Sequence, residues 1–255
     1  MLDKKVIAAQ LYTVREFLKT PQDIGESLAK IKKIGYDAVQ VSGMGPIDPM
    51  QLKDIVDALG LKICATHTPV ERLTDDIKGV AEEHRLWGCD YVGIGSMPKE
   101  YRTSREGFST FAKKFSKIAK EFADRGLRFV YHNHKFEFQK FDGITGMEIL
   151  MNESDPETFQ FEIDTYWVQA GGADPAKWIK KVKGRMEIVH LKDMAIIDDN
   201  QAFAEVGEGN LDWDAILKAC TEAGVKWYAV EQDKCRCDPF DSLAVSLGNL
   251  LKMQA

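Results

Sequence analysis

Cysteine is scarce in this chain of 255 residues, and its five cysteines are scattered and odd in number. Cys235 and Cys237 stand closer together than the cysteines of a zinc ribbon, so we interpret them as loop thiols. No apolar run approaches the ~18 residues of a membrane span, and the N-terminus lacks the layout of a signal peptide. We therefore expect reduced thiols, a cytoplasmic location and no membrane partner.

Basic charge is also in short supply. The chain has 34 lysines and arginines against 40 aspartates and glutamates, and its formal net charge is −6. A nucleic-acid-binding surface would carry the opposite sign. Glycine-rich phosphate loops are missing as well, because no G-x-G-x-x-G follows the first expected strand and the stretch 205–213 differs from a P-loop. We therefore expect no nucleic acid as a partner.

The chain does contain a repeated junction, in which a helical pattern ends at a glycine and a strand begins within a few residues. Glycine at the end of a helix can take the left-handed conformation that closes it. The long interval after Gly126 spans about two such units, with the missing junction near Asp155-Pro156. The six glycines are Gly35, Gly60, Gly88, Gly126, Gly184 and Gly224.

These junctions separate eight predicted strands. Amphipathic stretches such as 24–34 and 107–123 lie between them and are typical of helices with one buried face. Eight alternating units predict an α/β fold, a (β/α)8 TIM barrel formed by residues 1–255 as a single domain. A doubly wound sheet is the alternative, but it has no natural use for eight strands. The predicted strands are 6–12, 37–42, 62–67, 91–95, 127–132, 158–164, 186–191 and 227–232.

Polar and ionisable residues collect at the carboxyl ends of these strands, where the active sites of barrels lie. Asp164, His190 and Glu231 end three successive strands, so they are expected to be neighbours around the mouth. His132 and His134 come at the end of the strand before them and point the same way. Each could be a hydrogen-bonded structural group, but together they predict a metal site. Mixed carboxylate and imidazole ligation suits Mn²⁺, Zn²⁺, Co²⁺ or Mg²⁺.

Lys192 is predicted to face the same interior as His190, two residues before it. A buried lysine needs an anion or acts as an acid or base. The structural alternative is a salt bridge with Asp193 or Glu162. His67 ends the third predicted strand and is a further candidate at the mouth.

Two more positions are candidates for contact with a ligand. Trp167 could form an apolar wall for a sugar ring, although core packing explains it equally well. Glu208 lies between two glycines in the stretch 205–213, where the backbone can approach a ligand closely. Asp212 in the same stretch is expected to cap the following helix.

The whole chain resembles the sugar phosphate isomerase/epimerase family of xylose isomerase-like barrels. This family includes ketose 3-epimerases, inosose dehydratases and 3-keto-glycoside-processing enzymes. The resemblance implies that Asp164, His190 and Glu231 are metal ligands. It is carried by Tyr131-His132-Asn133-His134 with Glu137, Glu162 to Trp167, His190 to Asp193, Gly207-Glu208-Gly209 with Asp212-Trp213, and Val230 to Asp233.

The fifth strand departs from the family pattern. Relatives usually carry a glutamate there as fourth ligand, and in many epimerases it forms the acid/base pair with the glutamate of the last strand. His132 occupies the matching position, so it is the expected fourth ligand, with His134 as a rival. Glu137 lies further out, where a related glutamate reaches the substrate in some members. A histidine-rich fifth strand is more similar to the inosose dehydratases and keto-glycoside lyases.

The resemblance implies a divalent-metal-dependent sugar or keto-sugar isomerase/epimerase that acts through an enediolate intermediate, with Mn²⁺ as the expected cation. The alternatives are a dehydratase or lyase on an inosose or 3-keto-glycoside, and a sugar-binding barrel without catalysis. Type IV endonuclease activity is disfavoured by the acidic charge, and a homo-oligomer is possible. The expected site residues are Glu231, Lys192 and His134 for proton transfer and His67, Glu137, Trp167 and Glu208 for substrate binding.

Overall fold

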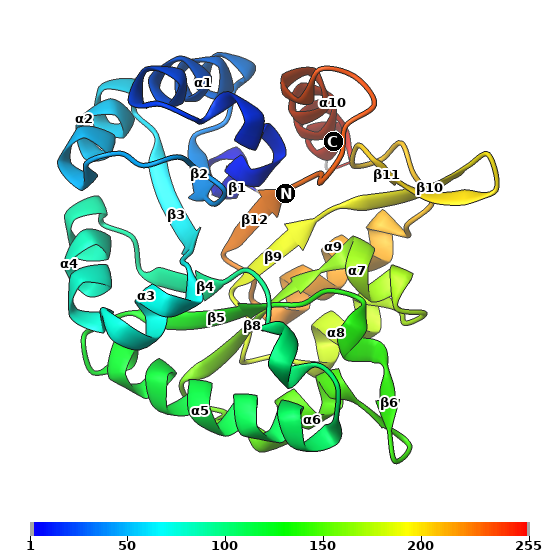
Figure 1. Ribbon diagram of the computed structural model, residues 1–255. Coiled ribbons are helices and arrows are strands. Elements are labelled where there is room, and N and C mark those ends of the chain that lie inside the picture. The colour runs from blue at the N-terminus through cyan, green and yellow to red at the C-terminus, as the bar shows by residue number, and fades with distance from the viewer. Residues whose placement is uncertain (1–2, 254–255) are drawn as a thin grey trace.

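The computed structural model describes residues 3–253, which form a closed barrel of eight parallel strands surrounded by helices (Figure 1). Each barrel strand lies within a predicted range, so the (β/α)8 prediction is confirmed and the doubly wound alternative is wrong. In order around the barrel, the strands are β1 (Ile7–Gln10), β12 (Trp227–Val230), β9 (Ile188–Leu191), β8 (Phe159–Asp164), β5 (Arg128–His132), β4 (Tyr91–Ile94), β3 (Lys62–His67) and β2 (Ala38–Val41).

The outer ring consists of helices that bury one apolar face against the strands. In the longest of them, which covers the predicted amphipathic stretch 107–123, Phe108, Phe111, Phe115 and Ile118 are buried on one face. Short 3₁₀ turns follow β1, β4 and β5. The helices are α1 (Pro21–Ile34), α2 (Pro49–Leu59), α3 (Val70–Asp75), α4 (Ile77–Trp87), α5 (Arg105–Ala123), α6 (Gly146–Glu153), α7 (Thr165–Ala170), α8 (Pro175–Lys181), α9 (Trp213–Ala223) and α10 (Pro239–Lys252).

The predicted glycine junctions all have positive φ angles, from 62° at Gly60 to 121° at Gly35. This region of the backbone map is open to glycine and strained for most other residues. The junction without a glycine follows α6, where Ser154 has an extended backbone with φ of −88°. The chain therefore turns there without a left-handed residue, which explains why no glycine marks this unit.

Two hairpins interrupt the repeat and were not predicted. One pairs β6 (Lys140–Phe141) with β7 (Ile144–Thr145), and the other pairs β10 (Asp193–Ile197) with β11 (Asn200–Ala204). The second hairpin projects outward from the barrel (Figure 1). It turns at Asp198 and Asp199, whose φ angles of 49° and 65° match the left-handed conformation of tight hairpin turns.

The interior of the barrel has two different ends. Near the amino ends of the strands it holds an apolar cluster, and near the carboxyl ends it holds buried polar and charged residues. Within residues 3–253, no helix is both long and apolar enough to cross a lipid bilayer. The apolar cluster consists of Ala8, Ala38, Cys64, Ala65, Tyr91, Val130 and Ile188.

Candidate metal centre

Four side chains from successive strands converge at the carboxyl end of the barrel. They are His132 of β5, Asp164 of β8, His190 of β9 and Glu231, which follows β12, and none is more than 5% exposed. One ligand atom from each lies within 4.8 Å of the others. The strand-end pattern thus brings together the four residues predicted as ligands, in a group that could hold a metal ion.

The hydrogen bonds of His132 leave one ring nitrogen facing the cluster. Its Nδ1 lies 3.0 Å from the carbonyl oxygen of Gly95, so we assign the proton to Nδ1 as the donor. The lone pair of Nε2 then faces Oδ2 of Asp164 at 3.2 Å. Two acceptors at this distance fit a cation between them, and metal-binding histidines typically donate their other ring N–H to a carbonyl that fixes the tautomer.

His190 turns its other ring nitrogen, Nδ1, toward the cluster. Nε2 lies 2.8 Å from Oε1 of Gln40 and 3.2 Å from Oε1 of Glu162, whereas Nδ1 lies 2.9 Å from Oε2 of Glu231. Burial disfavours the imidazolium, but Glu162 and Glu231 outweigh it and hold the pKa of His190 well above its ordinary value. The cluster therefore attracts positive charge, and its nitrogen and oxygen donors fit a divalent cation.

Lys192 supplies such a charge in the described structure. Its Nζ lies 2.9 Å from Oδ2 of Asp164, 2.6 Å from Oε2 of Glu231 and 2.7 Å from Oδ2 of Asp233. Although burial opposes the charge, these carboxylates raise the pKa of Lys192. The sequence predicted a salt bridge of Lys192 with Asp193 or Glu162 as the structural alternative. Lys192 does form salt bridges, but neither of these two residues is a partner.

Asp193 does not contact Lys192, because its carboxylate points into the loop between β11 and α9 and accepts hydrogen bonds there. Its oxygens accept hydrogen bonds from the backbone N–H groups of Gly207, Gly209 and Leu211, and from Nε1 of Trp213. A carboxylate with so many donors orders the loop that follows the hairpin. Lys192 is thereby left to the carboxylates inside the barrel.

A cavity of about 240 Å³ lies over the cluster and is lined in part by Glu231 and Asp233. A second cavity of about 270 Å³ extends the mouth toward α3 and shares His67, Gly95 and Ser96 with the first. The other lining residues of the first cavity are Tyr12, Ser42 and His134. The cluster therefore opens onto a space where a small molecule can reach it.

His134 and Trp167 lie beside this mouth, with their rings 5.2 Å apart. The Nζ of Lys192 is 5.5 Å from the centre of the Trp167 ring. Burial and the nearby His132 and Lys192 lower the pKa of His134 to about 2, so the ring is neutral. His134 lies outside the four-residue group, and the geometry thus favours His132 as the ligand from this strand.

Orphaned polar atoms also mark the mouth as a ligand site. Four buried side-chain nitrogen or oxygen atoms have no hydrogen-bond partner within residues 3–253, and three belong to residues at the carboxyl end of a strand or in the segment that follows it. These three are Nε2 of Gln10, Nδ1 of His134 and Nε1 of Trp167. Buried polar atoms are nearly always paired in folded proteins, so such a group indicates a place for a polar ligand or water.

Two of the predicted substrate-binding residues lie elsewhere. Glu137 is fully buried and turned toward Tyr131, whose hydroxyl donates to it at 2.7 Å, while the backbone N–H of His134 donates at 3.0 Å. Glu208 is exposed, and its carboxylate accepts a hydrogen bond from Asn249 of α10. Neither side chain joins the cluster or lines the two cavities at the mouth.

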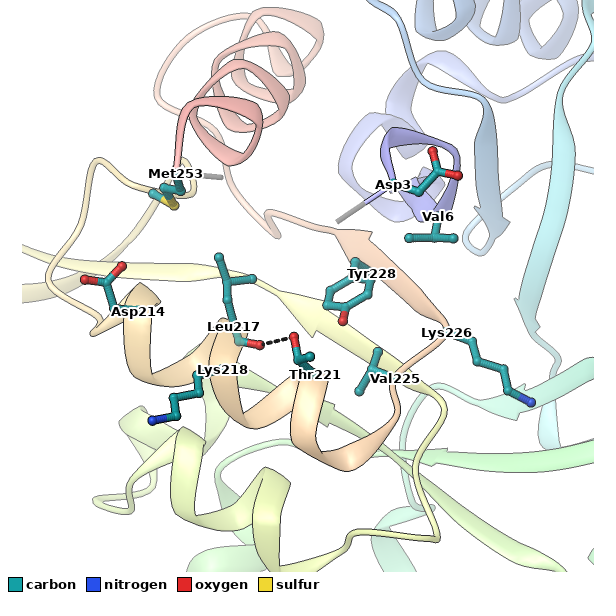
Figure 2. Close-up of a pocket in the computed structure, with 10 residues that line it drawn as sticks. All are labelled: Asp3, Val6, Asp214, Leu217, Lys218, Thr221, Val225, Lys226, Tyr228 and Met253. Carbon is teal, nitrogen blue, oxygen red and sulfur yellow. Dashed lines mark hydrogen bonds between the residues drawn. The ribbon is translucent and has the colours of Figure 1, made fainter. Parts of the chain in front are cut away.

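A larger cavity of about 660 Å³ lies at the other end of the barrel (Figure 2). It is bordered by Val6 before β1 and by Tyr228 near the start of β12. Leu217 and Thr221 of α9 also border it, and the hydroxyl of Thr221 donates a hydrogen bond to the carbonyl oxygen of Leu217. None of the predicted site residues lines it. Because barrel active sites lie at the carboxyl ends of the strands, size does not make this cavity the functional one.

Comparison with known proteins decides the family. The model of the xylose isomerase-like TIM barrel family matches residues 28–244. The chain belongs to this family. It is similar to the inosose dehydratase of Geobacillus thermodenitrificans, with 31% identity over 85% of each chain, and to that of Bacillus cereus, with 27% identity over 85% of each.

Solved structures place this xylose isomerase-like barrel among further relatives. A sugar phosphate isomerase/epimerase from Parabacteroides distasonis matches with a TM-score of 0.80 and 25% identity, over 98% of this chain and 94% of that one. An L-ribulose 3-epimerase matches with a TM-score of 0.71 at 15% identity, over 96% and 93%, which supports the fold alone. Dehydratases and epimerases thus both occur among the proteins that this xylose isomerase-like chain is similar to.

Sequence reasoning undervalued several residues of this xylose isomerase-like site. Three further residues lie at the carboxyl ends of strands or just after them, namely Gln40, Ser42 and Asp233. Their positions mark them as candidates, but the sequence does not indicate a role for any of them. Their roles depend on hydrogen bonds to residues far away in the sequence, such as Gln40 to His190 and Asp233 to Lys192. Only the closed barrel brings these residues together.

Proposed function

We propose that this protein is a divalent-metal-dependent lyase that removes a β-substituent from an inosose or another keto-sugar. The observation that carries the proposal is the pairing of Glu231 with a buried ammonium at the mouth. Glu231 borders the cavity, and Nζ of Lys192 lies 2.6 Å from its Oε2. Elimination needs one base for the proton α to the carbonyl and a positive group for the oxygens that gain charge.

His132, Asp164, His190 and Glu231 would hold the cation, and Mn²⁺ is the ion we expect. When bound, the cation supplies a Lewis acid for the substrate carbonyl and its adjacent hydroxyl. Glu231 then accepts the α-proton, and the electrons of that C–H bond form the enediolate. As the enediolate collapses, the bond from the β-carbon to its oxygen breaks, and the departing oxygen takes up the proton that Glu231 has gained.

Lys192 remains charged during this sequence, because three carboxylates stabilise its ammonium. We assign it to the oxygen that gains negative charge, and not to the base. His134 and Trp167 provide a neutral wall with polar edges beside the cavity, which suits a polyhydroxylated ring. No arginine lines the two cavities at the mouth, which favours a neutral keto-sugar over a sugar phosphate.

Isomerisation or epimerisation, the first expectation from the sequence, is the second candidate. It is favoured by the similarity to the isomerase/epimerase from Parabacteroides distasonis. Epimerisation needs proton transfer on both faces of the α-carbon, and the resemblance assigns this to two glutamates. Here β5 carries His132, whose Nε2 faces Asp164 in the cluster, in place of the second glutamate. Elimination therefore fits the described side chains better.

Mass spectrometry of reactions in D₂O tests the proposal. The Mn²⁺-loaded protein is incubated with inososes, 3-keto-glycosides and ketoses, and the products are compared with those of E231Q. A lyase gives a product lighter by water or by the glycoside's leaving group. An epimerase gives a product of unchanged skeleton that carries one deuterium. Epimer without elimination supports the second candidate, and no product across the panel supports a barrel that binds without catalysis.

A further inference from the structure

Glu162 of β8 lies directly below the metal-ligand cluster and is fully buried. Oε2 faces Nε2 of His67 at 2.6 Å, and Oε1 faces Nε2 of Gln40 at 2.8 Å and Nε2 of His190 at 3.2 Å. Gln40 donates its amide to this carboxylate, and a carboxylate at hydrogen-bond distance from an imidazole holds the ring proton on the nitrogen that faces it. An ionised carboxylate only accepts hydrogen bonds, so each nitrogen facing it donates.

This bond determines which nitrogen of His67 carries the proton. A neutral imidazole has one proton, and Glu162 draws it to Nε2. The lone pair is therefore on Nδ1. Nδ1 points to the mouth, where it lies 3.4 Å from the hydroxyl of Ser42, and both residues line the cavity over the cluster.

The space beside Nδ1 is kept open by a missing side chain. A Cβ placed on Gly95 would lie 2.9 Å from Nδ1 of His67 and 3.1 Å from its Cγ, closer than van der Waals contact allows. Gly95 does not have a positive φ angle, so its backbone does not require glycine. Access to the His67 ring is the reason that the geometry offers for a glycine here.

We propose that Nδ1 of His67 accepts a hydrogen bond from a hydroxyl of the substrate, and that Glu162 is the positioning residue that fixes His67 for this contact. The inference rests on the proposed function for its substrate class, a polyhydroxylated ketone. Because Glu162 also holds His190, one carboxylate aligns a residue that contacts substrate and a metal ligand. The site then recognises one substrate hydroxyl in addition to those that the cation would bind.

Nuclear magnetic resonance of ¹⁵N-histidine-labelled protein tests the tautomer directly. The chain has five histidines, and the H67N variant identifies the signals of His67. We expect a protonated Nε2 and an unprotonated Nδ1 in the wild type, with and without Zn²⁺. In E162Q the amide can donate to Nε2, so we expect the proton to move to Nδ1 in part or all of the protein.

The contact is tested with myo-inositol as an unreactive polyhydroxylated probe on the Zn²⁺-loaded protein. We expect the Nδ1 signal to move as myo-inositol is added. H67Q retains an amide donor near the Nε2 position but has no acceptor at the Nδ1 position, so its affinity for the probe should fall about tenfold, the equivalent of one hydrogen bond. H67N retains an acceptor near Nδ1 and should recover part of the affinity.

G95A provides a variant that leaves every hydrogen-bonding group in place. Its Cβ would crowd Nδ1 of His67 and should weaken myo-inositol binding. G248A on α10 is the matched control, because a Cβ there meets no atom within 4 Å, and its affinity for the probe should equal that of the wild type.

A proton on Nδ1 in the wild type, or an Nδ1 signal that stays fixed up to the solubility limit of myo-inositol, overturns the inference. Equal probe affinity in H67Q and the wild type does the same. These readouts need no turnover, so they separate the inference from the proposed reaction. If they hold and no keto-sugar is eliminated, the polyol contact stands and the assignment as a lyase fails.

Discussion

The two ends of the barrel interior are built on the same strands, yet they are held by different forces. At the amino end, Ala8, Val130 and Ile188 pack as an apolar cluster, and burial of apolar surface stabilises it without specific partners. At the carboxyl end, Asp164 and Lys192 are equally buried, but each is stable only because it has charged partners. The amino end therefore stabilises the fold, whereas the carboxyl end holds a site at some cost in stability.

The carboxyl end should respond most to loss of a ligand. D164N removes a charge that faces His132, His190 and Lys192. We expect turnover to fall at least ~10³-fold, because Lewis-acid catalysis supplies several kcal/mol to the transition state. Steady-state kinetics on the best substrate of the panel measures this. Turnover within tenfold of the wild type would mean that Asp164 holds no catalytic metal.

The two ends should also differ in what a bound ion does for stability. K192M leaves the carboxylates of Asp164, Glu231 and Asp233 without their ammonium, which should destabilise the metal-free protein by about 3–5 kcal/mol. A divalent cation restores positive charge there, so Mn²⁺ should raise the melting temperature of K192M more than that of the wild type. Thermal melts with and without Mn²⁺ check this, and equal shifts would contradict it.

A core substitution at the amino end should show the opposite behaviour. I188A removes a fully buried side chain and should lower the free energy of unfolding by about 3 kcal/mol through lost burial and a cavity. Mn²⁺ affinity should stay within a factor of two, since no ligand moves. Urea denaturation and metal titration measure the two quantities. A loss of Mn²⁺ affinity in I188A would show that the ends are not independent.

The smallest expected effect concerns Glu137, which is buried outside both regions. Burial raises its pKa from the usual 4.5 to about 7. Between these values the folded protein holds a proton that the unfolded chain does not, so this contribution is present at low pH and is lost as pH rises through 7. The slope is at most about 1.4 kcal/mol per pH unit.

The E137Q variant cannot titrate at this position, so it isolates the contribution of Glu137 to the pH dependence of stability. Urea denaturation from pH 5 to 8 should show a shallower fall of stability with pH in E137Q than in the wild type. Parallel curves for the two proteins would mean that Glu137 is ionised in the fold throughout this range.

The fold could be predicted from the sequence because its signals are local. A helix end with a left-handed glycine, such as Gly88, and an apolar run, such as the one ending at His132, each involve a few neighbouring residues. The proximity of the candidate metal ligands followed from the same rule, since the strand order of a closed barrel makes Asp164, His190 and Glu231 neighbours once the strands are known.

What could not be predicted depends on contacts between distant residues or on where a strand ends. The pairing of His67 with Glu162 joins positions 95 residues apart. Glu137 was expected at the substrate because the family resemblance places a related glutamate there, but β5 ends at His132 and a 3₁₀ turn (Phe136–Phe138) comes next. The alternation of faces does not continue through such a turn, so the side chain points toward Tyr131.

The measurement that tests the metal centre most directly is a Mn²⁺ titration followed by electron paramagnetic resonance, in which free Mn²⁺ gives the signal. The geometry predicts one tightly bound ion per wild-type chain, a bound ion in I188A, and loss of tight binding in D164N. Free Mn²⁺ from the first addition in the wild type, or tight binding that persists in D164N, would contradict the assignment of the carboxyl end as a metal centre.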